Sequence, residues 1–166
     1  MKTYDWSSFT QRININVPVE KLYKAFATRA GMESWFLRMC KYKNADGQHL
    51  KADEYINQGD SYKWLWYGWP DSTEETGDFL SANNKDELSF VFGKAGIVTI
   101  KIYTVAAETI VELRQDNIPA DEASKFNFHV GCSMGWVFYL ANLKSIMEGG
   151  IDLRNKNIDL KNVLNA

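Results

Sequence analysis

The sequence predicts an α+β fold in which a curled antiparallel sheet of about six to seven strands surrounds one long C-terminal helix. Three observations lead to this prediction: one strand pattern is followed by two short helical patterns, about six strand patterns come next, and a long apolar helix ends the series. Antiparallel pairing is expected because hairpins need few connecting residues, whereas parallel pairs need long crossovers. The 166 residues are expected to form one domain, residues 1–166, with a polar tail over residues 151–166.

The first three elements lie near the N-terminus. Residues 9–17 alternate apolar and polar side chains, which predicts a half-buried strand that ends at Pro18. Residues 19–26 then carry apolar side chains at i, i+3, i+4 and i+7, the spacing of a short amphipathic helix. Thr28 is predicted to cap a second short helix that runs toward the aromatic pair at residues 35–36.

Turn residues divide the middle of the chain into strands. Six further strands are expected, at residues 39–42, 62–67, 76–81, 87–92, 97–105 and 109–117. In the second of these, Tyr62, Trp64 and Trp66 share one face, because side chains alternate along a strand, and we expect this face to point inward. The inward faces of the later strands are expected to carry Leu88, Phe90, Phe92, Val98, Ile100, Ile102, Val111, Leu113 and Gln115.

The long helix is expected from about Gly131 to Glu148, with Trp136 at the centre of its apolar face. It should end at the glycine pair that follows, since glycine reaches the left-handed conformation of a C-terminal cap. Apolar side chains also extend around much of its other side, so the helix is expected to contact a cavity, a loop or a partner subunit besides the sheet. The tail is expected to pack through Ile158, Leu160, Val163 and Leu164, with a short helix after Asp159.

The composition argues against several functions. The net charge is −2 and the isoelectric point is about 5.7, so no basic surface for nucleic acid is expected. No segment approaches the roughly 18 apolar residues of a membrane span and no signal peptide is recognised, so we expect a cytoplasmic protein without a membrane partner. Cys40 and Cys132 lack the spacing of a metal site and are interpreted as reduced thiols.

Short motifs run through nearly the whole chain. They are INVPVEKLYKAF at residues 15–26, WF at residues 35–36, GDSYKW at residues 59–64, GW at residues 135–136 and EGG at residues 148–150. With these motifs the chain resembles the START-like superfamily, which has the helix-grip fold of the birch-pollen allergen. Within that superfamily it is similar to the branch named for the activator of the heat-shock-protein ATPase.

The resemblance implies a START-like domain and leaves several functions open. Proteins of this fold bind lipids, hormones or polyketides, some catalyse cyclisations, and one eukaryotic branch stimulates the ATPase of a chaperone. The resemblance thus implies either a hydrophobic small ligand, or a chaperone partner and a role in the stress response. The eukaryotic activator also has a separate N-terminal domain that helps to bind the chaperone, whereas this sequence begins almost at its first expected strand.

No catalytic constellation is visible in the sequence, and neither a cofactor nor a metal site is expected. His49, Asp53 and Glu54 are interpreted as a solvated polar face, because one histidine beside two acids in a polar segment is typical of exposed surface. His129 precedes the long helix and is interpreted as a packing or capping residue.

Two polar positions allow alternatives. Gln115 either presents its amide to the cavity, where the amide needs a hydrogen-bond partner, or is exposed at a strand end. Asp152 and Arg154 form either an exposed ion pair or a clamp that holds the tail.

The leading hypothesis is a protein that binds a small apolar or amphipathic molecule in the cleft between the sheet and the long helix. The aromatic inner faces and the scarcity of acid and base groups favour binding over catalysis. The candidate lining residues are Trp64, Trp66, Ile100, Leu113, Gln115 and Phe138. The alternatives are a protein-interaction or co-chaperone-like module, including a homodimer, and a cyclase-type enzyme.

Overall fold

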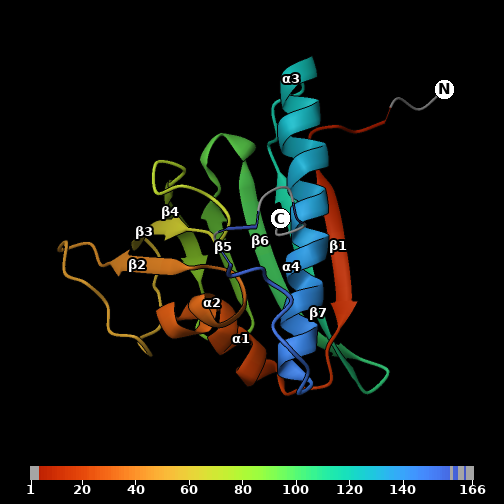
Figure 1. Ribbon diagram of the computed structural model, residues 1–166. Coiled ribbons are helices and arrows are strands. Elements are labelled where there is room, and N and C mark those ends of the chain that lie inside the picture. Colours follow the sequence, from red (N-terminus) through yellow and green to blue (C-terminus); the bar gives the residue numbers. More distant parts are fainter. Residues whose placement is uncertain (1–3, 158, 161–162, 164–166) are drawn as a thin grey trace.

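The computed structural model describes residues 4–157, 159–160 and 163, and it places a curled sheet around one long helix (Figure 1). The predicted order of one strand, two short helices, six strands and a long helix is confirmed. In chain order the elements are β1 (Phe9–Asn14), α1 (Val19–Ala27), α2 (Arg29–Trp35), β2 (Met39–Lys43), β3 (Ser61–Leu65), β4 (Glu75–Ala82), β5 (Glu87–Val91), η1 (Gly93–Ala95), β6 (Ile97–Val105), β7 (Glu108–Asp116), α3 (Glu122–Ser124), η2 (Lys125–Val130) and α4 (Gly131–Met147).

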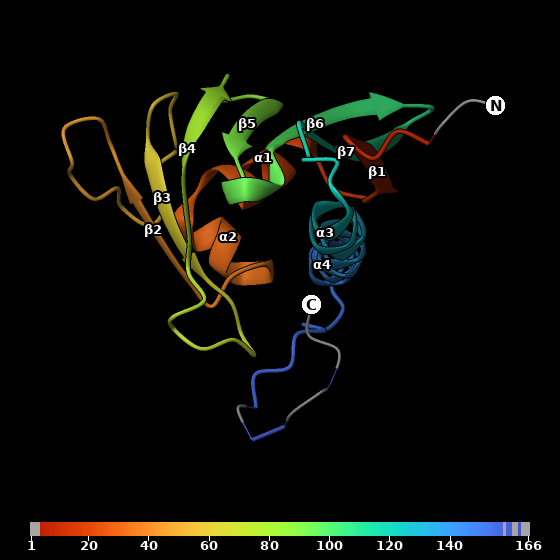
Figure 2. The same cartoon turned by 90° about the horizontal axis from the view of Figure 1, so that it is seen from above.

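The seven strands form one sheet in the order β1-β7-β6-β5-β4-β3-β2, and every pair is antiparallel, as predicted. The register of β4 against β5 shifts between Phe79 and Ser81, and an irregularity of this kind bends a strand. Seen from above, the sheet curves around α2 and α4, which lie on its concave side (Figure 2).

The predicted inward faces of the strands are confirmed as the core. Trp64, Ile100 and Leu113 are at most 1% exposed, and Trp136 of α4, at 3%, packs on the same core. The remaining predicted inward side chains that are buried are Tyr62, Leu88, Phe90, Val98, Ile102, Val111 and Gln115, while Trp66 and Phe92 are half-buried.

A buried hydrogen-bonded link joins α4 to the sheet. The indole Nε1 of Trp136 donates to Oε1 of Gln115 at 2.9 Å, and Nε2 of Gln115 donates to the carbonyl oxygen of Ala95 at 2.8 Å. Gln115 is fully buried, so the alternative of an exposed strand end is wrong. The physical reason is that η1 folds back over this end of β7 and offers a carbonyl acceptor to the amide.

The two short helices meet at Thr28, the predicted cap. Its Oγ1 accepts a hydrogen bond from the backbone N–H of Gly31 at 3.0 Å and donates to the carbonyl of Lys24 at 2.9 Å, so one hydroxyl serves both helix ends. A Cβ atom on Gly31 would lie 2.7 Å from Cα of Ala25, which shows how closely α1 and α2 approach. Only glycine fits at this contact without movement of the backbone.

The long helix begins earlier than the sequence pattern predicted. Asp121 accepts a hydrogen bond from the backbone N–H of Ser124 at 3.0 Å and caps α3, which continues through the π-helical segment η2 into α4. The predicted start at Gly131 matches α4 alone. Asp121 followed by an acidic residue was the available signal for the true start.

Arg154 clamps the tail onto α2, and the exposed alternative for this residue is wrong. The residue is 7% exposed, and its guanidinium donates to the carbonyl oxygens of Glu33, Ser34 and Leu37 at 2.8–3.1 Å, as well as to the carboxylate of Asp152. The three carbonyls belong to the end of α2 and the residues after it, where backbone acceptors lack helical partners. A cation placed there also interacts favourably with the helix dipole.

Asn142 of α4 completes this clamp. Its amide nitrogen donates to the carbonyl of Trp35 at 2.6 Å, and its amide oxygen accepts from the backbone N–H of Leu153 at 2.7 Å. One side chain therefore ties α4 to both α2 and the start of the tail.

The predicted packing of the later tail is wrong where the structure describes it. Leu160 and Val163 are 53% and 45% exposed, and no helix forms at the described positions 159–160 and 163. Ile158 and Leu164 lie outside the described residues. The polar clamp, rather than apolar packing, holds the start of the tail, and neither Leu160 nor Val163 is among the side chains packed on the core.

Trp136→Ala should lower the free energy of unfolding by about 3–5 kcal/mol, because it empties a core site and leaves Oε1 of Gln115 without its donor. Chemical denaturation measures this loss. Val105→Ala, at a 56% exposed position at the end of β6, is the control and should change stability by no more than about 0.5 kcal/mol. A loss below about 1 kcal/mol for Trp136→Ala would contradict the central packing of this indole.

Acid should release the tail clamp. Burial works to raise the pKa of Asp152, but hydrogen bonds from Arg154 and Lys156 outweigh it and hold the pKa well below its usual range. A carboxylate with a depressed pKa contributes stability above its unfolded-state pKa of about 3.9, and this contribution is lost as the pH falls toward the folded-state value. In urea denaturation, Asp152→Asn should therefore be less stable than the wild type at pH 7, and the difference should shrink below about pH 4. Asp46→Asn, in an exposed turn, is the control, and a difference that stays constant with pH would contradict the clamp.

Candidate functional site

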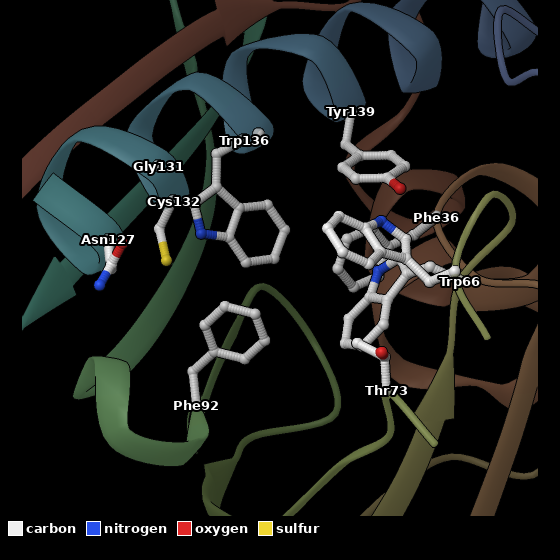
Figure 3. A pocket seen from close by; sticks show the side chains of 11 residues that line it. Phe36, Trp66, Thr73, Phe92, Asn127, Gly131, Cys132, Trp136 and Tyr139 are labelled. Atoms are coloured by element: carbon white, nitrogen blue, oxygen red, sulfur yellow. The ribbon is translucent and has the colours of Figure 1, made fainter. Parts of the chain in front are cut away.

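A pocket of about 260 Å³ opens between the first half of α4 and the ends of α2, β3 and β5 (Figure 3). Its walls are mainly aromatic. The lining residues are Phe36, Trp66, Trp69, Thr73, Phe92, Asn127, Gly131, Cys132, Gly135, Trp136 and Tyr139. Phe36, Trp66 and Phe92 each come directly after the last residue of an element, so the pocket forms where the regular structure stops.

The aromatic side chains of the pocket hold one another in place. Phe36 stacks on Trp136 with ring centroids 5.0 Å apart, and it meets Tyr139 edge to face at 4.7 Å and Trp66 at 5.7 Å. Phe92 lies 5.6 Å from Trp136. Because each of these five rings contacts at least one other and Trp136 is fixed by Gln115, this part of the wall is pre-formed rather than dependent on a ligand.

Two glycines leave room in the wall that α4 contributes. Gly131 and Gly135 are one helical turn apart and both line the pocket. A Cβ atom on Gly135 would meet nothing within 4 Å, and one on Gly131 would meet only the carbonyl of Phe126 at 3.6 Å. The space at the Cβ position of Gly135 is therefore open.

Polar groups at the pocket are few. Thr73 and Asn127 offer uncharged hydrogen-bonding groups, and Cys132 offers a thiol. Burial raises the pKa of the Cys132 thiol, and the negative charge of Glu75 raises it further. The thiolate is the nucleophilic form, so this environment disfavours nucleophilic chemistry at neutral pH.

Glu75 lies behind the pocket wall, beside Gly93. A Cβ atom on Gly93 would lie 2.7 Å from Oε2 of Glu75, so the carboxylate packs against the backbone next to Phe92. Glu75 is half-buried, and burial raises the pKa of its carboxyl group. No lysine or arginine of the described chain forms an ion pair with it.

Of the six candidate lining residues, Trp66 lines this pocket. The others do not belong to its lining: Trp64, Ile100, Leu113 and Gln115 lie in the core, and Phe138 is half-buried with its ring against Tyr139. Contact of these five residues with a ligand stays a prediction. Sequence reasoning missed the pocket role of Phe36, Phe92, Trp136 and Tyr139, although it had placed Phe92 on an inward face and Trp136 on the apolar face of the long helix. The sequence carried no signal for this role, because the path of the chain beyond each element decides which of these side chains meet.

His129 packs against the N-terminal segment and does not line the pocket. The residue is 4% exposed; its Nδ1 lies 2.9 Å from the carbonyl oxygen of Trp6 and its Nε2 lies 3.0 Å from the hydroxyl of Tyr4. Its ring also meets Tyr4, Trp6 and Phe9 edge to face. The packing interpretation of this histidine fits these contacts.

The polar segment around His49 forms a separate, shallow hollow on the surface. His49, Asp53 and Glu54 do lie together in its lining. Within the part of the chain that the structure describes, no group of three histidine, cysteine or acidic side chains is placed to hold a metal ion. The described helices also include none that is both long and apolar enough to cross a membrane.

Solved structures of similar fold include three from bacteria. A Staphylococcus saprophyticus protein matches with a TM-score of 0.67 and 19% identity, over 89% of this chain and 96% of its own. The Aha1 dimer from Colwellia psychrerythraea matches with a TM-score of 0.64 and 17% identity, over 86% and 97%. A Cytophaga hutchinsonii protein matches with a TM-score of 0.61 and 19% identity, over 85% and 93%. These likenesses show the helix-grip fold.

Sequence comparison adds the family. A search of curated proteins finds no match. The family described as activator of Hsp90 ATPase homolog 1-like protein matches residues 16–148, which is most of the 166-residue chain. The match includes every strand after β1, both short helices and all of α4. The chain therefore belongs to the family of activator of Hsp90 ATPase homolog 1-like proteins.

Proposed function

We propose that this protein binds a small apolar or amphipathic molecule in the pocket between α4 and the ends of the sheet. The observation that carries the proposal is a pre-formed, aromatic-walled space of about 260 Å³ at the one end of α4 where the core does not close. Ligand pockets commonly measure roughly 300–1,000 Å³. The size therefore suits a small molecule, or one end of a longer amphiphile, rather than a whole sterol or lipid.

Burial of apolar ligand surface supplies the affinity in this proposal. Each square ångström of apolar surface removed from water contributes about 25 cal/mol. Thr73 and Asn127 at the wall are suited to orient one polar group of the ligand. The raised pKa of Cys132 supports binding over covalent catalysis, and a cyclase-type enzyme is the alternative that would use the same pocket.

We propose a second copy of the chain as a partner, on a different surface. Phe126, Met134 and Val137 project from the outer side of η2 and α4 and are 73%, 68% and 53% exposed. Residues 126–143 contain no lysine, arginine, aspartate or glutamate, so two copies could pack along this helix without charge repulsion. The Colwellia neighbour is a dimer, which supports the proposal. A chaperone, the partner suggested by the family's description, is the alternative occupant of this surface.

Both cysteines are free thiols, and Cys40 is buried with its pKa raised by burial to about 12. This state fits a reducing compartment, and we propose the cytoplasm as the location.

Gly135→Leu should fill the pocket and leave the fold intact. Intrinsic tryptophan fluorescence, titrated with fatty acids, flavonoids and polyketide-like aromatics, should show binding of the smaller compounds to the wild type and at least about tenfold weaker binding to the variant. Stability should not fall, because leucine favours a helix over glycine by roughly 0.8 kcal/mol. Ala141→Leu, at an exposed position of α4 outside the pocket lining, is the matched control and should bind as the wild type does. Equal binding by the wild type and Gly135→Leu would refute the pocket as the site.

The dimer proposal predicts a loss of association on charge introduction. Val137→Glu should convert a dimer of the wild type into a monomer in sedimentation equilibrium, because two like charges would face each other in a helix-to-helix interface. Lys41→Glu, on the distant strand β2, is the control for a change of charge. A wild type that stays monomeric at a concentration of about 0.1 mM would refute the proposed dimer. Its Kd would then be near 1 mM or weaker, which corresponds to a binding free energy of only about 4 kcal/mol.

A further inference from the structure

We infer that the pocket recognises an organic cation, namely an alkylated ammonium group, through its aromatic rings and the carboxylate of Glu75. The inference rests on the proposed function, because it names the chemical class of the molecule that the same pocket binds. It goes beyond that function by assigning a charge to the ligand.

The aromatic walls provide the first argument. Six rings from four segments of the chain line one small space: Phe36, Trp66, Trp69, Phe92, Trp136 and Tyr139. Figure 3 shows the rings of Phe36, Trp66, Phe92, Trp136 and Tyr139 gathered at the pocket, where Phe36 stacks on Trp136. The face of an aromatic ring carries partial negative charge, so a cation enclosed by several rings is attracted by each of them. Three of the six rings are tryptophan, the side chain that attracts cations most strongly.

The carboxylate of Glu75 provides the second argument. It lies against the backbone of Gly93, the residue after Phe92, and no described lysine or arginine pairs with it. Its charge reaches the pocket wall, because it raises the pKa of the Cys132 thiol, which lines the pocket. Among the described residues that line the pocket, none has a charged side chain. Two arginines lie close to the wall: Arg38 donates to the carbonyl oxygen of Trp66, and Arg154 partly offsets the rise that burial causes in the pKa of Tyr139. Each of them is paired with a carboxylate, Arg38 with Asp71 and Arg154 with Asp152, whereas Glu75 has no such partner among the described residues.

The hydrogen-bonding capacity of the wall selects the type of cation. A primary ammonium carries three N–H donors, and each needs an acceptor when water is removed. Apart from its aromatic residues and its thiol, the wall offers the side chains of Thr73 and Asn127. A quaternary ammonium has methyl groups in place of N–H donors, so it loses no hydrogen bonds in this pocket. Its compact shape also suits a space of about 260 Å³.

The direct test compares choline with its uncharged isostere, the dimethylbutanol in which a carbon atom replaces the quaternary nitrogen. The two compounds have nearly the same shape, so isothermal titration calorimetry separates the effect of the charge from that of apolar burial. We expect choline to bind on the order of tenfold more tightly than the isostere. Glu75→Gln should weaken choline binding several-fold and leave binding of the isostere unchanged. Glu74→Gln is the matched control, because the neighbouring carboxylate pairs with Lys63 and does not line the pocket.

The outcomes distinguish this inference from the function on which it rests. Equal binding of choline and the isostere, both abolished in Gly135→Leu, would overturn the inference of a cationic ligand and leave the pocket as the binding site. Binding of uncharged aromatics without any binding of choline would likewise overturn the cationic ligand but not the pocket. Failure of every compound, charged or neutral, would overturn the proposed function itself. The central comparison uses the wild-type chain, so it stands even if Glu75→Gln fails to fold.

Discussion

The buried link from Trp136 through Gln115 to the carbonyl of Ala95 fixes the position of the long helix, and the pocket depends on it. Two polar side chains can be buried here because every donor in the link has an acceptor: Nε1 of Trp136 at 2.9 Å and Nε2 of Gln115 at 2.8 Å. The link also sets the plane of the Trp136 ring, on which Phe36 stacks. Without it, α4 could slide or rotate on an apolar surface that is otherwise tolerant of such movement, and the aromatic wall would lose its geometry.

The two halves of α4 make different contacts. The C-terminal half is held tightly, because Asn142 and Arg154 tie it and the tail to the end of α2 through buried hydrogen bonds. The N-terminal half, beside η2, lies over the ends of β3 and β5. There the pocket is lined by Trp66 and Phe92, which follow these strands, and by the helical glycines Gly131 and Gly135. A π-helical segment such as η2 often accompanies a functional site, and here it carries Asn127 into the pocket lining. The polar clamp thus lies at one end of the helix and the pocket at the other.

Sequence patterns identified those parts of the fold that depend on local periodicity. Alternation along the strands placed Trp64, Ile100 and Leu113 inside the sheet, and the position of Thr28 before an apolar segment identified a helix cap. The pocket could not be predicted in the same way, because Phe36 and Phe92 lie just after their elements, where periodicity ends and the path of the chain in space decides which side chains meet. A tail clamp was one of two alternatives for Asp152 and Arg154, and the sequence could not decide between them, since the acceptors of Arg154 are backbone carbonyls and backbone atoms carry no sequence signal.

The central claim is that the aromatic pocket beside α4 is the binding site of a small molecule. Chemical-shift mapping by NMR with the tightest-binding compound tests it most directly, because it reports the position of the ligand residue by residue. The account predicts shifts at the indole N–H of Trp66 and the amide of Gly135, which line the pocket, with little change at Met134 on the outer side of the helix. Shifts confined to Met134 and its neighbours, with unchanged signals from Trp66 and Gly135, would contradict the account.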